Sequence, residues 1–172
     1  MGKASRDKGA RGEREVAILF RQWLGDDWTV RRLRTMDQSD TGDLVILPPD
    51  GHPPFPFAVE VKTSASINLA SLLWDPCALW RSWWTQACKQ AEKGGKAPLL
   101  VFKRDRSPWL VAMWRWDDPA DALRPVCHVE PTHVVASVRP LSALLALDPA
   151  CLLEVGPCPR STPRVFWRWG RD

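Results

Sequence analysis

Residues 57–63, with the sequence FAVEVKT, decide the fold of this 172-residue chain. The alternation predicts a β-strand on which Glu60 and Lys62 project from one face, while Val59 and Val61 point to the other. Burying a carboxylate and an ammonium is costly unless they are paired or bound to a metal. An acid and a lysine on one face of a buried strand therefore indicate a functional site.

A second acid stands just before the preceding apolar run. Gly42-Asp43 comes ahead of LVIL, and sixteen residues separate Asp43 from Glu60. Two carboxylates held together repel each other and create a hard, oxygen-rich site suited to Mg²⁺, for which Mn²⁺ can substitute. Lys62 could then serve an attacking water or offset charge on a phosphate. The alternative is that Glu60 and Lys62 form an ordinary ion pair on a solvated sheet face.

Hydrophobic periodicity around this strand predicts an α/β core. Helices are expected over 12–24 and from Asp75-Pro76 to about Lys93, and strands over 28–33, 43–47, 57–63, 98–103 and 108–114. In the first helix Glu13 falls at the inner end of the apolar stripe, an unusual place for a solvated charge. We take 1–116 as the core and 117–172 as a C-terminal extension packed on it, with a strand at 133–138 and a helix at 141–147.

Charge is distributed in blocks along the chain. The formal net charge is +4 and the isoelectric point is near 9.0. Residues 1–34 carry a net +4, residues 35–80 a net −5, and residues 81–106 a net +5. Basic blocks that flank an acidic one suit an enzyme that neutralises DNA phosphates and holds a metal beside one of them. Solvated basic faces are the alternative interpretation.

Composition excludes several classes of protein. Hydrophobic residues make up 45% and charged residues 26%, which is typical of a globular domain rather than a disordered chain. There is no apolar run of about 20 residues and no signal peptide, so we expect no membrane association. The five cysteines include no CxxC pair and fit a reducing compartment. We therefore expect a cytoplasmic protein without an organic cofactor.

The order of these motifs resembles a known group of enzymes. Asp43 followed by Glu60-x-Lys62, behind a helix that bears Glu13, is similar to the PD-(D/E)xK nuclease superfamily. Lys8-Gly9, Glu13-Arg14-Glu15, Gly42-Asp43-Leu44, Val59-Glu60-Val61-Lys62 and a later helix with Gln86 resemble, in order and spacing, archaeal-type Holliday junction resolvases and their phage-borne relatives. The resemblance covers about residues 6–116 and implies the fold of that superfamily, a central mixed sheet flanked by helices. Thr41-Gly42 stands where the superfamily's naming proline would be.

The resemblance implies roles for individual residues. Asp43 and Glu60 would hold the metal with the main-chain carbonyl of Val61, and Glu13 would reach it directly or through water. Lys62 would serve the attacking water. Gln86 would join the catalytic set, although it could equally be a solvated helix residue. Phosphate contacts are expected from the basic blocks, at Arg14, at one of Arg31, Arg32 and Arg34, and at Lys103.

The resulting hypothesis is a Mg²⁺-dependent endonuclease that resolves four-way DNA junctions by paired, symmetric nicks as a homodimer. Another DNA nuclease of the same fold (restriction, repair or flap type) and a non-catalytic DNA-binding subunit are the alternatives. The dimer prediction rests on symmetry and on a surplus of apolar surface, because Trp80, Trp83 and Trp84 share one helix face with Leu79 nearby. That face could instead belong to the core.

Overall fold

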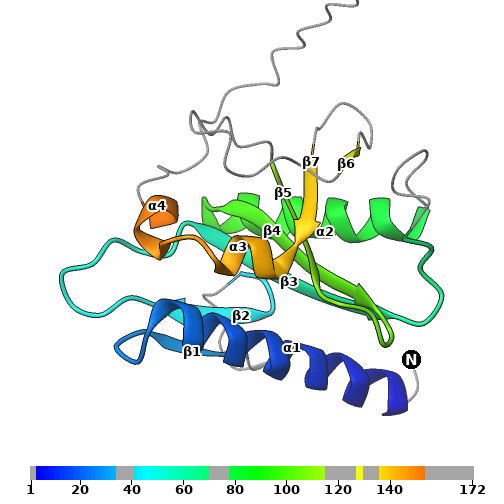
Figure 1. Ribbon diagram of the computed structural model, residues 1–172, viewed down its shortest axis with the longest axis horizontal. Coiled ribbons are helices and arrows are strands. Elements are labelled where there is room, and N and C mark those ends of the chain that lie inside the picture. Colours follow the sequence, from blue (N-terminus) through cyan, green and yellow to red (C-terminus); the bar gives the residue numbers. More distant parts are fainter. Residues whose placement is uncertain (1–2, 34–40, 70–77, 115–126, 130–135, 154–172) are drawn as a thin grey trace, which may run out of the picture.

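A mixed five-stranded sheet forms the centre of the computed structural model, which describes residues 3–33, 41–69, 78–114, 127–129 and 136–153 (Figure 1). Its strand order is β3-β4-β5-β7-β6, in which β3 and β4 are parallel and the remaining pairs are antiparallel. The predicted mixed α/β fold is confirmed. The five strands are β3 (Phe57–Ser64), β4 (Ala97–Arg104), β5 (Leu110–Trp114), β6 (Cys127–Val129) and β7 (Ala136–Pro140).

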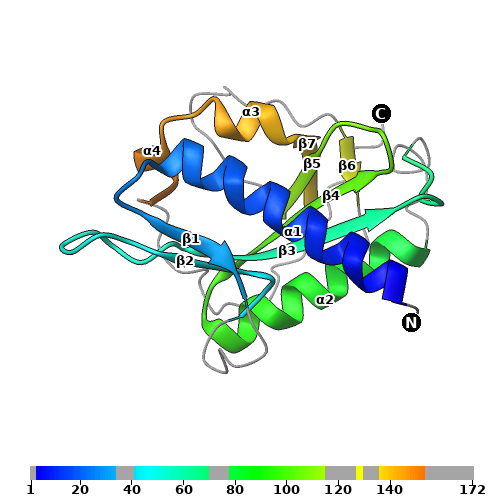
Figure 2. The same ribbon diagram turned by 90° about the horizontal axis from the view of Figure 1, so that it is seen from below.

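Two long helices lie on opposite sides of this sheet (Figures 1 and 2). Helix α1 (Lys3–Leu24) packs on β3 and on the separate β1–β2 hairpin, formed by β1 (Thr29–Arg32) and β2 (Leu44–Leu47). Helix α2 (Ala78–Gly94) connects β3 to β4, as a parallel strand pair requires. The two short helices, α3 (Leu141–Leu145) and α4 (Pro149–Leu153), bury their leucines on the same face as α1.

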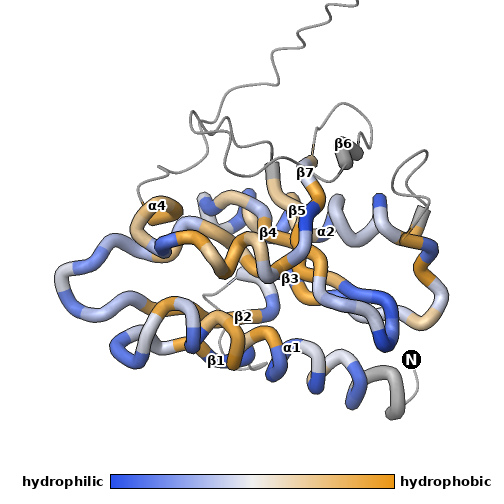
Figure 3. Tube along the Cα trace, viewed as in Figure 1, coloured by the Kyte–Doolittle hydropathy of each residue, from blue (hydrophilic) through white to orange (hydrophobic). Residues whose placement is uncertain are grey.

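The two faces of the sheet have separate hydrophobic cores. Val16 and Phe20 of α1 pack with Val59 of β3 in one of them. The other contains Trp80 and Phe102, from α2 and β4. Figure 3 shows hydrophobic positions gathered between the layers and hydrophilic ones at the tip of the β4–β5 hairpin.

The tryptophans of α2 are core residues, which corrects the expectation of surplus apolar surface. Trp80 and Trp84 are fully buried and stack with ring centroids 5.9 Å apart, and Trp83 is also buried. Leu141 and Leu144 of α3 are buried as well. These side chains therefore cannot form a dimer contact, because the sheet of their own chain already covers them.

Several element bounds differ from those expected. Helix α1 begins at Lys3 rather than at residue 12, because glycine inside a helix lowers its propensity without forbidding it. It ends at Leu24, and the next residue, Gly25, has a φ of 97°, which suits the left-handed residue that terminates a helix. The expected start of α2 at Asp75-Pro76 and residues 133–135 of a predicted strand lie outside the described residues.

The segment after residue 116 contributes to the central sheet. Strand β7 pairs with β5 in antiparallel register, so that Ala112 lies opposite Val138. Strand β6 pairs with the other edge of β7, also antiparallel. Strand β6 and helix α4 were not expected from the sequence. No helix among the described residues is long and apolar enough to cross a membrane.

Candidate active site

Glu60 is the buried centre of the candidate site. It lies in the middle of β3 and is only 1% exposed, so the alternative of a solvated sheet face does not describe it. Its Oε1 accepts hydrogen bonds from Lys62 Nζ on the same strand and from Gln86 Nε2 on α2, each at 2.5 Å. An ion pair and a side-chain amide thus offset the cost of burying the carboxylate.

Asp43 is held against the edge of β3 that faces away from β4. Its backbone N–H donates to the Val59 carbonyl at 2.7 Å, and its Oδ2 accepts from the Val61 N–H at 2.8 Å. The side chain therefore satisfies a strand-edge donor that a neighbouring strand would otherwise take. These two bonds fix the carboxylate beside Glu60, as the sequence spacing predicted.

Gly42 makes this close approach of the chain possible. Its φ is +90°, and a Cβ at this position would lie 2.5 Å from the Val59 carbonyl oxygen. Only glycine adopts this conformation and also leaves room for the strand. Gly94, at the end of α2, likewise has no room for a Cβ because Thr41 packs against it. Both glycines set the position of the segment that carries Asp43.

The Asp43 and Glu60 carboxylates lie close enough to repel each other. Burial and the negative charge of Glu60 raise the pKa of Asp43 from 3.8 to about 7, and Glu13 adds to the increase. The Val61 N–H and the Lys62 ammonium oppose it. Binding a cation between Asp43 and Glu60 would relieve this repulsion.

The donor set fits a hard divalent cation. Mg²⁺ is bound in many enzymes by one or two carboxylates, with water and phosphate oxygens completing its coordination. Asp43 and Glu60 meet that requirement. Within the described parts of the chain, no three His, Cys, Asp or Glu side chains gather as a cage that could hold a metal ion by itself.

Glu13 lies at the edge of this site with a partner of its own. Its carboxylate, 16% exposed, accepts a hydrogen bond from Arg32 Nε of β1. The influence of Glu13 on the pKa of Asp43 shows that the two acids are neighbours. The structure therefore brings Asp43, Glu60, Lys62 and Gln86 together, with Glu13 beside them but bonded to an arginine.

The predicted phosphate contacts are spread over the surface around α1. Arg14 is exposed on α1, and Arg31 and Arg32 lie on β1. Arg34 lies outside the described residues. Lys103 of β4 is on the other side of α1, where its ammonium bonds to Glu15 at 2.9 Å and lies 4.1 Å from the ring centroid of Trp109.

Sequence reasoning missed two features. The first is the pair of tight glycine contacts, which the Thr41-Gly42 and Gly94-Gly95 dipeptides could have indicated as more than turn residues. The second is a cluster of charged side chains on the far side of α1, in which Lys8 contacts Asp105. Residues this far apart in the sequence leave no local signal of their proximity.

Comparison with known proteins agrees with this geometry. Residues 4–138, most of the chain, match the family described as "Phage putative PDDEXK endonuclease". The chain belongs to this PDDEXK endonuclease family. It is also 30% identical over 151 residues to Protein D14 of Escherichia phage T5, covering 86% of this chain and 91% of that protein. The predicted superfamily is thereby confirmed.

One solved structure is similar in outline. It is Hjc, a Holliday junction resolvase from the archaeal hyperthermophile Archaeoglobus fulgidus, with 16% sequence identity and a TM-score of 0.39. The match covers 85% of this chain and 95% of that one. Nucleases of the PD-(D/E)xK type generally use divalent metals, which is consistent with the paired carboxylates described above.

Proposed function

We propose that this PDDEXK nuclease is a Mg²⁺-dependent endonuclease that cuts four-way DNA junctions by paired nicks. The observation that carries the proposal is the buried Glu60 carboxylate, held by Lys62 and Gln86 beside an Asp43 whose pKa is raised to about 7. Buried, mutually repelling carboxylates cost stability unless a cation is bound between them, and a positioned lysine completes the chemistry of phosphodiester hydrolysis.

The residues have separate tasks in this mechanism. Asp43, Glu60 and the Val61 carbonyl would hold the metal, which when bound supplies a Lewis acid and lowers the pKa of water. Gln86 fixes the rotamer of Glu60 through its 2.5 Å hydrogen bond. Lys62, held in place by Glu60, faces the reacting phosphate with an ammonium that stabilises developing negative charge.

Glu13 and the arginines around it would orient the substrate. The Glu13–Arg32 ion pair joins α1 to β1 at the mouth of the site. Arg14 and one of Arg31, Arg32 and Arg34 would contact phosphates, and Lys103 would do so on the other side of α1. DNA as a substrate implies the cytoplasm of a bacterial or phage-infected cell.

Junction preference and a homodimer are the finer parts of the proposal. The junction preference rests on the order of the sequence motifs, which resembles that of junction resolvases. Two equivalent strands must be nicked to release two duplexes, and a two-fold dimer presents two identical sites for this. With the α2 tryptophans buried, the dimer contact must use other surface.

A panel of matched DNA substrates tests the proposal. Purified protein is incubated with Mg²⁺ and with a four-way junction, a linear duplex, a flap and a single strand of shared sequence. We expect symmetric nicks and a preference for the junction over the duplex of at least about 10³. Light scattering should give a mass near twice 19.5 kDa.

Other outcomes would redirect the proposal. Equal cleavage of junction and duplex, or a monomer under cleavage conditions, would remove the resolvase function and leave a nuclease of restriction, repair or flap type. Binding without cleavage of any substrate, with Mg²⁺ or Mn²⁺, would indicate a non-catalytic DNA-binding subunit.

A further inference from the structure

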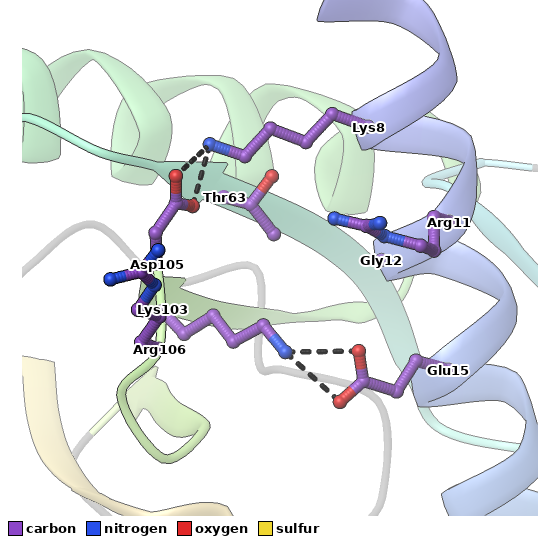
Figure 4. Close-up of a pocket in the computed structure, with 8 residues that line it drawn as sticks. All are labelled: Lys8, Arg11, Gly12, Glu15, Thr63, Lys103, Asp105 and Arg106. Carbon is purple, nitrogen blue, oxygen red and sulfur yellow. Dashed lines mark hydrogen bonds and ion pairs between the residues drawn. The ribbon is translucent and has the colours of Figure 1, made fainter.

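A pocket of about 310 Å³ lies on the side of α1 that faces β4, away from the acidic site (Figure 4). Helix α1 and the β4–β5 hairpin form its walls, and Thr63 of β3 forms part of its floor. Six charged side chains line it, four of them basic: Lys8, Arg11, Lys103, Arg106, Glu15 and Asp105. The pocket therefore has an excess of two positive charges over its two carboxylates.

Two of the four cations are neutralised within the pocket. Lys8 Nζ lies 2.5 Å from a carboxylate oxygen of Asp105, and Lys103 Nζ lies 2.9 Å from Glu15. Figure 4 shows Arg11 between these two ion pairs. Within the described part of the chain, neither Arg11 nor Arg106 has an ion pair or a side-chain hydrogen bond of its own. A cluster that served only to tie α1 to the hairpin would not need these two guanidinium groups.

The ion pairs hold the Lys8 and Lys103 ammonium groups in place before any ligand arrives. Lys103 is held by Glu15 and by the face of Trp109, and Trp109 Nε1 donates to Glu15 Oε1 at 2.7 Å. Charges that are already oriented lose little conformational entropy on binding an anion. Guanidinium groups are also the side chains best matched to phosphate oxygens, because they donate two parallel hydrogen bonds.

The pocket is separate from the acidic site. Glu13 and Glu15 are two residues apart on α1, which places them roughly 200° apart around the helix. Glu13 faces Asp43 and β1, whereas Glu15 faces β4 and β5. Between them, Gly12 seats the helix on Thr63, where a Cβ would lie only 3.0 Å from the threonine methyl group. The two glutamates therefore lie on different sides of α1, and Glu60 points to the opposite face of the sheet, where it bonds to Gln86 of α2.

We propose that this pocket binds a backbone phosphate of the DNA, distinct from the phosphate that is cut. Arg11 and Arg106 contact it directly, and Lys8 and Lys103 supply fixed positive charge. The inference rests on the proposed DNA nuclease function and adds a second anchoring point on the other flank of α1. Two anchoring points fix the direction in which the DNA backbone crosses the helix, and phosphate contacts of this kind set register rather than sequence.

Salt-dependent binding tests the pocket without depending on cleavage. Binding of one fluorescent four-way junction is measured in EDTA over a salt series for Arg11→Gln, Arg106→Gln and the control Lys96→Gln, at the opposite end of β4. We expect each arginine variant to flatten the log–log slope by about 0.9 and the control to leave it unchanged. Glu15→Gln should bind more tightly, since it removes a negative charge from the pocket.

A second measurement identifies the phosphate. Junctions that carry a single neutral methylphosphonate are tested, with the modification at each backbone position around the branch point in turn. One position away from the cut should weaken binding of the wild-type protein by about tenfold and leave Arg11→Gln binding unaffected, because the variant has already lost that contact. The unfolding temperature of Arg106→Gln should match that of the wild type, because Arg106 makes no ion pair or side-chain hydrogen bond among the described residues. That of Arg11→Gln should fall only slightly, because the charge of Arg11 acts on the exposed Glu15.

The outcomes separate the pocket from the nuclease function. If the wild type cuts DNA but both arginine variants bind like Lys96→Gln, the pocket is not a phosphate site and the nuclease proposal stands. If no DNA is cut but the arginine variants lose slope and the methylphosphonate effect, the phosphate site stands and the nuclease proposal fails. Lower unfolding temperatures with unchanged slopes would show that the pocket is only structural.

Discussion

The two flanks of α1 hold charge in opposite ways. On the β1 flank, the half-buried Asp43 lies beside the buried Glu60, and desolvation together with the charge of Glu60 raises the pKa of Asp43 to about 7. On the β4 flank, Glu15 is 46% exposed, and cations approach it. Burial would raise its pKa, but hydrogen bonds from Lys103 and Trp109 and the charges of Lys103 and Arg11 hold the pKa of Glu15 below its usual 4.5.

The acidic site therefore holds like charges that repel each other, whereas the pocket on the β4 flank holds opposite charges that attract each other. Like charges on the first flank cost stability until a cation arrives, which is typical of a catalytic centre. Opposite charges on the second flank neutralise each other and leave a positive excess, which is typical of a binding surface. Substitutions on the two flanks should therefore differ in size and in sign.

The largest effect is expected from removing a carboxylate of the acidic flank. Glu60→Gln or Asp43→Asn should lower the rate of DNA nicking by at least about 10³, equivalent to roughly 4 kcal/mol of transition-state stabilisation. Binding should be unchanged or tighter, because repulsion of the phosphates decreases. Single-turnover cleavage with the exposed Glu92→Gln as control measures this, and a variant that still cuts at the wild-type rate excludes the assignment.

The next effect concerns the backbone that positions Asp43. Gly42 and Gly51 both have positive φ, 90° and 82°, but only at Gly42 would a Cβ meet another atom within 4 Å. Gly42→Ala should cost roughly 3 kcal/mol of unfolding free energy, and Gly51→Ala about 1. Chemical denaturation compares the two. Equal losses would show that the contact with Val59 relaxes without cost.

Replacing the lysine should give a somewhat smaller effect. Lys62→Ala should lower the nicking rate by about 10², as for the loss of one positioned, charge-stabilising group. Lys89→Ala, on the exposed surface of α2, is the matched control. If Lys62→Ala loses affinity for DNA and retains its maximal rate, the lysine belongs to phosphate binding, and the two flanks differ less than we infer.

Much of the acidic flank could be predicted from the sequence because its signals are local. The alternation in FAVEVKT gave the shared face of Glu60 and Lys62, and the helical stripe gave the place of Glu13 at its inner end. The tryptophan stripe of α2 could be recognised as one apolar face, but we interpreted it as surplus surface because its partners on β4 cannot be identified from the sequence. Strand β7 joins the sheet through pairing with β5, which no periodicity reveals.

The basic flank could not be predicted because its contacts are distant in sequence. Lys8 and Asp105 are 97 residues apart, and Lys103 and Glu15 are 88 apart. The charge distribution along the sequence indicated basic segments at residues 1–34 and 81–106, but not that they contact each other in the fold. The Glu13–Arg32 ion pair was missed for a related reason, since spacing gives the face of a helix but not the side chain that reaches it.

A stability measurement tests the strain on the acidic flank. Since the folded pKa of Asp43 is about 7 against 3.8 for the ordinary group, the folded state binds the extra proton. In EDTA, stability should therefore fall as the pH rises from about 4 to 7. Asp43→Asn should then be more stable than the wild type by roughly 2 kcal/mol at pH 8, with the difference vanishing near pH 4.

Thermal unfolding across this pH range checks the sign. Asp50→Asn, on an exposed turn, should track the wild type at every pH. If Asp43→Asn is less stable than the wild type at pH 8, the ionised Asp43 carboxylate stabilises the metal-free protein. The acidic flank would then not carry the unfavourable charge that we infer.

The smallest effect is expected on the basic flank, with the opposite sign. The lowered pKa of Glu15 means that its stabilising contribution is present above pH 4.5 and is lost as the pH falls through the folded value. Because the pair with Lys103 is partly exposed, Glu15→Gln should cost about 0.5 kcal/mol at pH 7 and nothing near pH 3. The amide oxygen can still accept from Trp109, which keeps the cost low. Denaturant titrations of Glu15→Gln beside Glu92→Gln measure it, and a loss above about 2 kcal/mol would show that this ion pair, rather than the apolar layer beneath it, holds α1 to the hairpin.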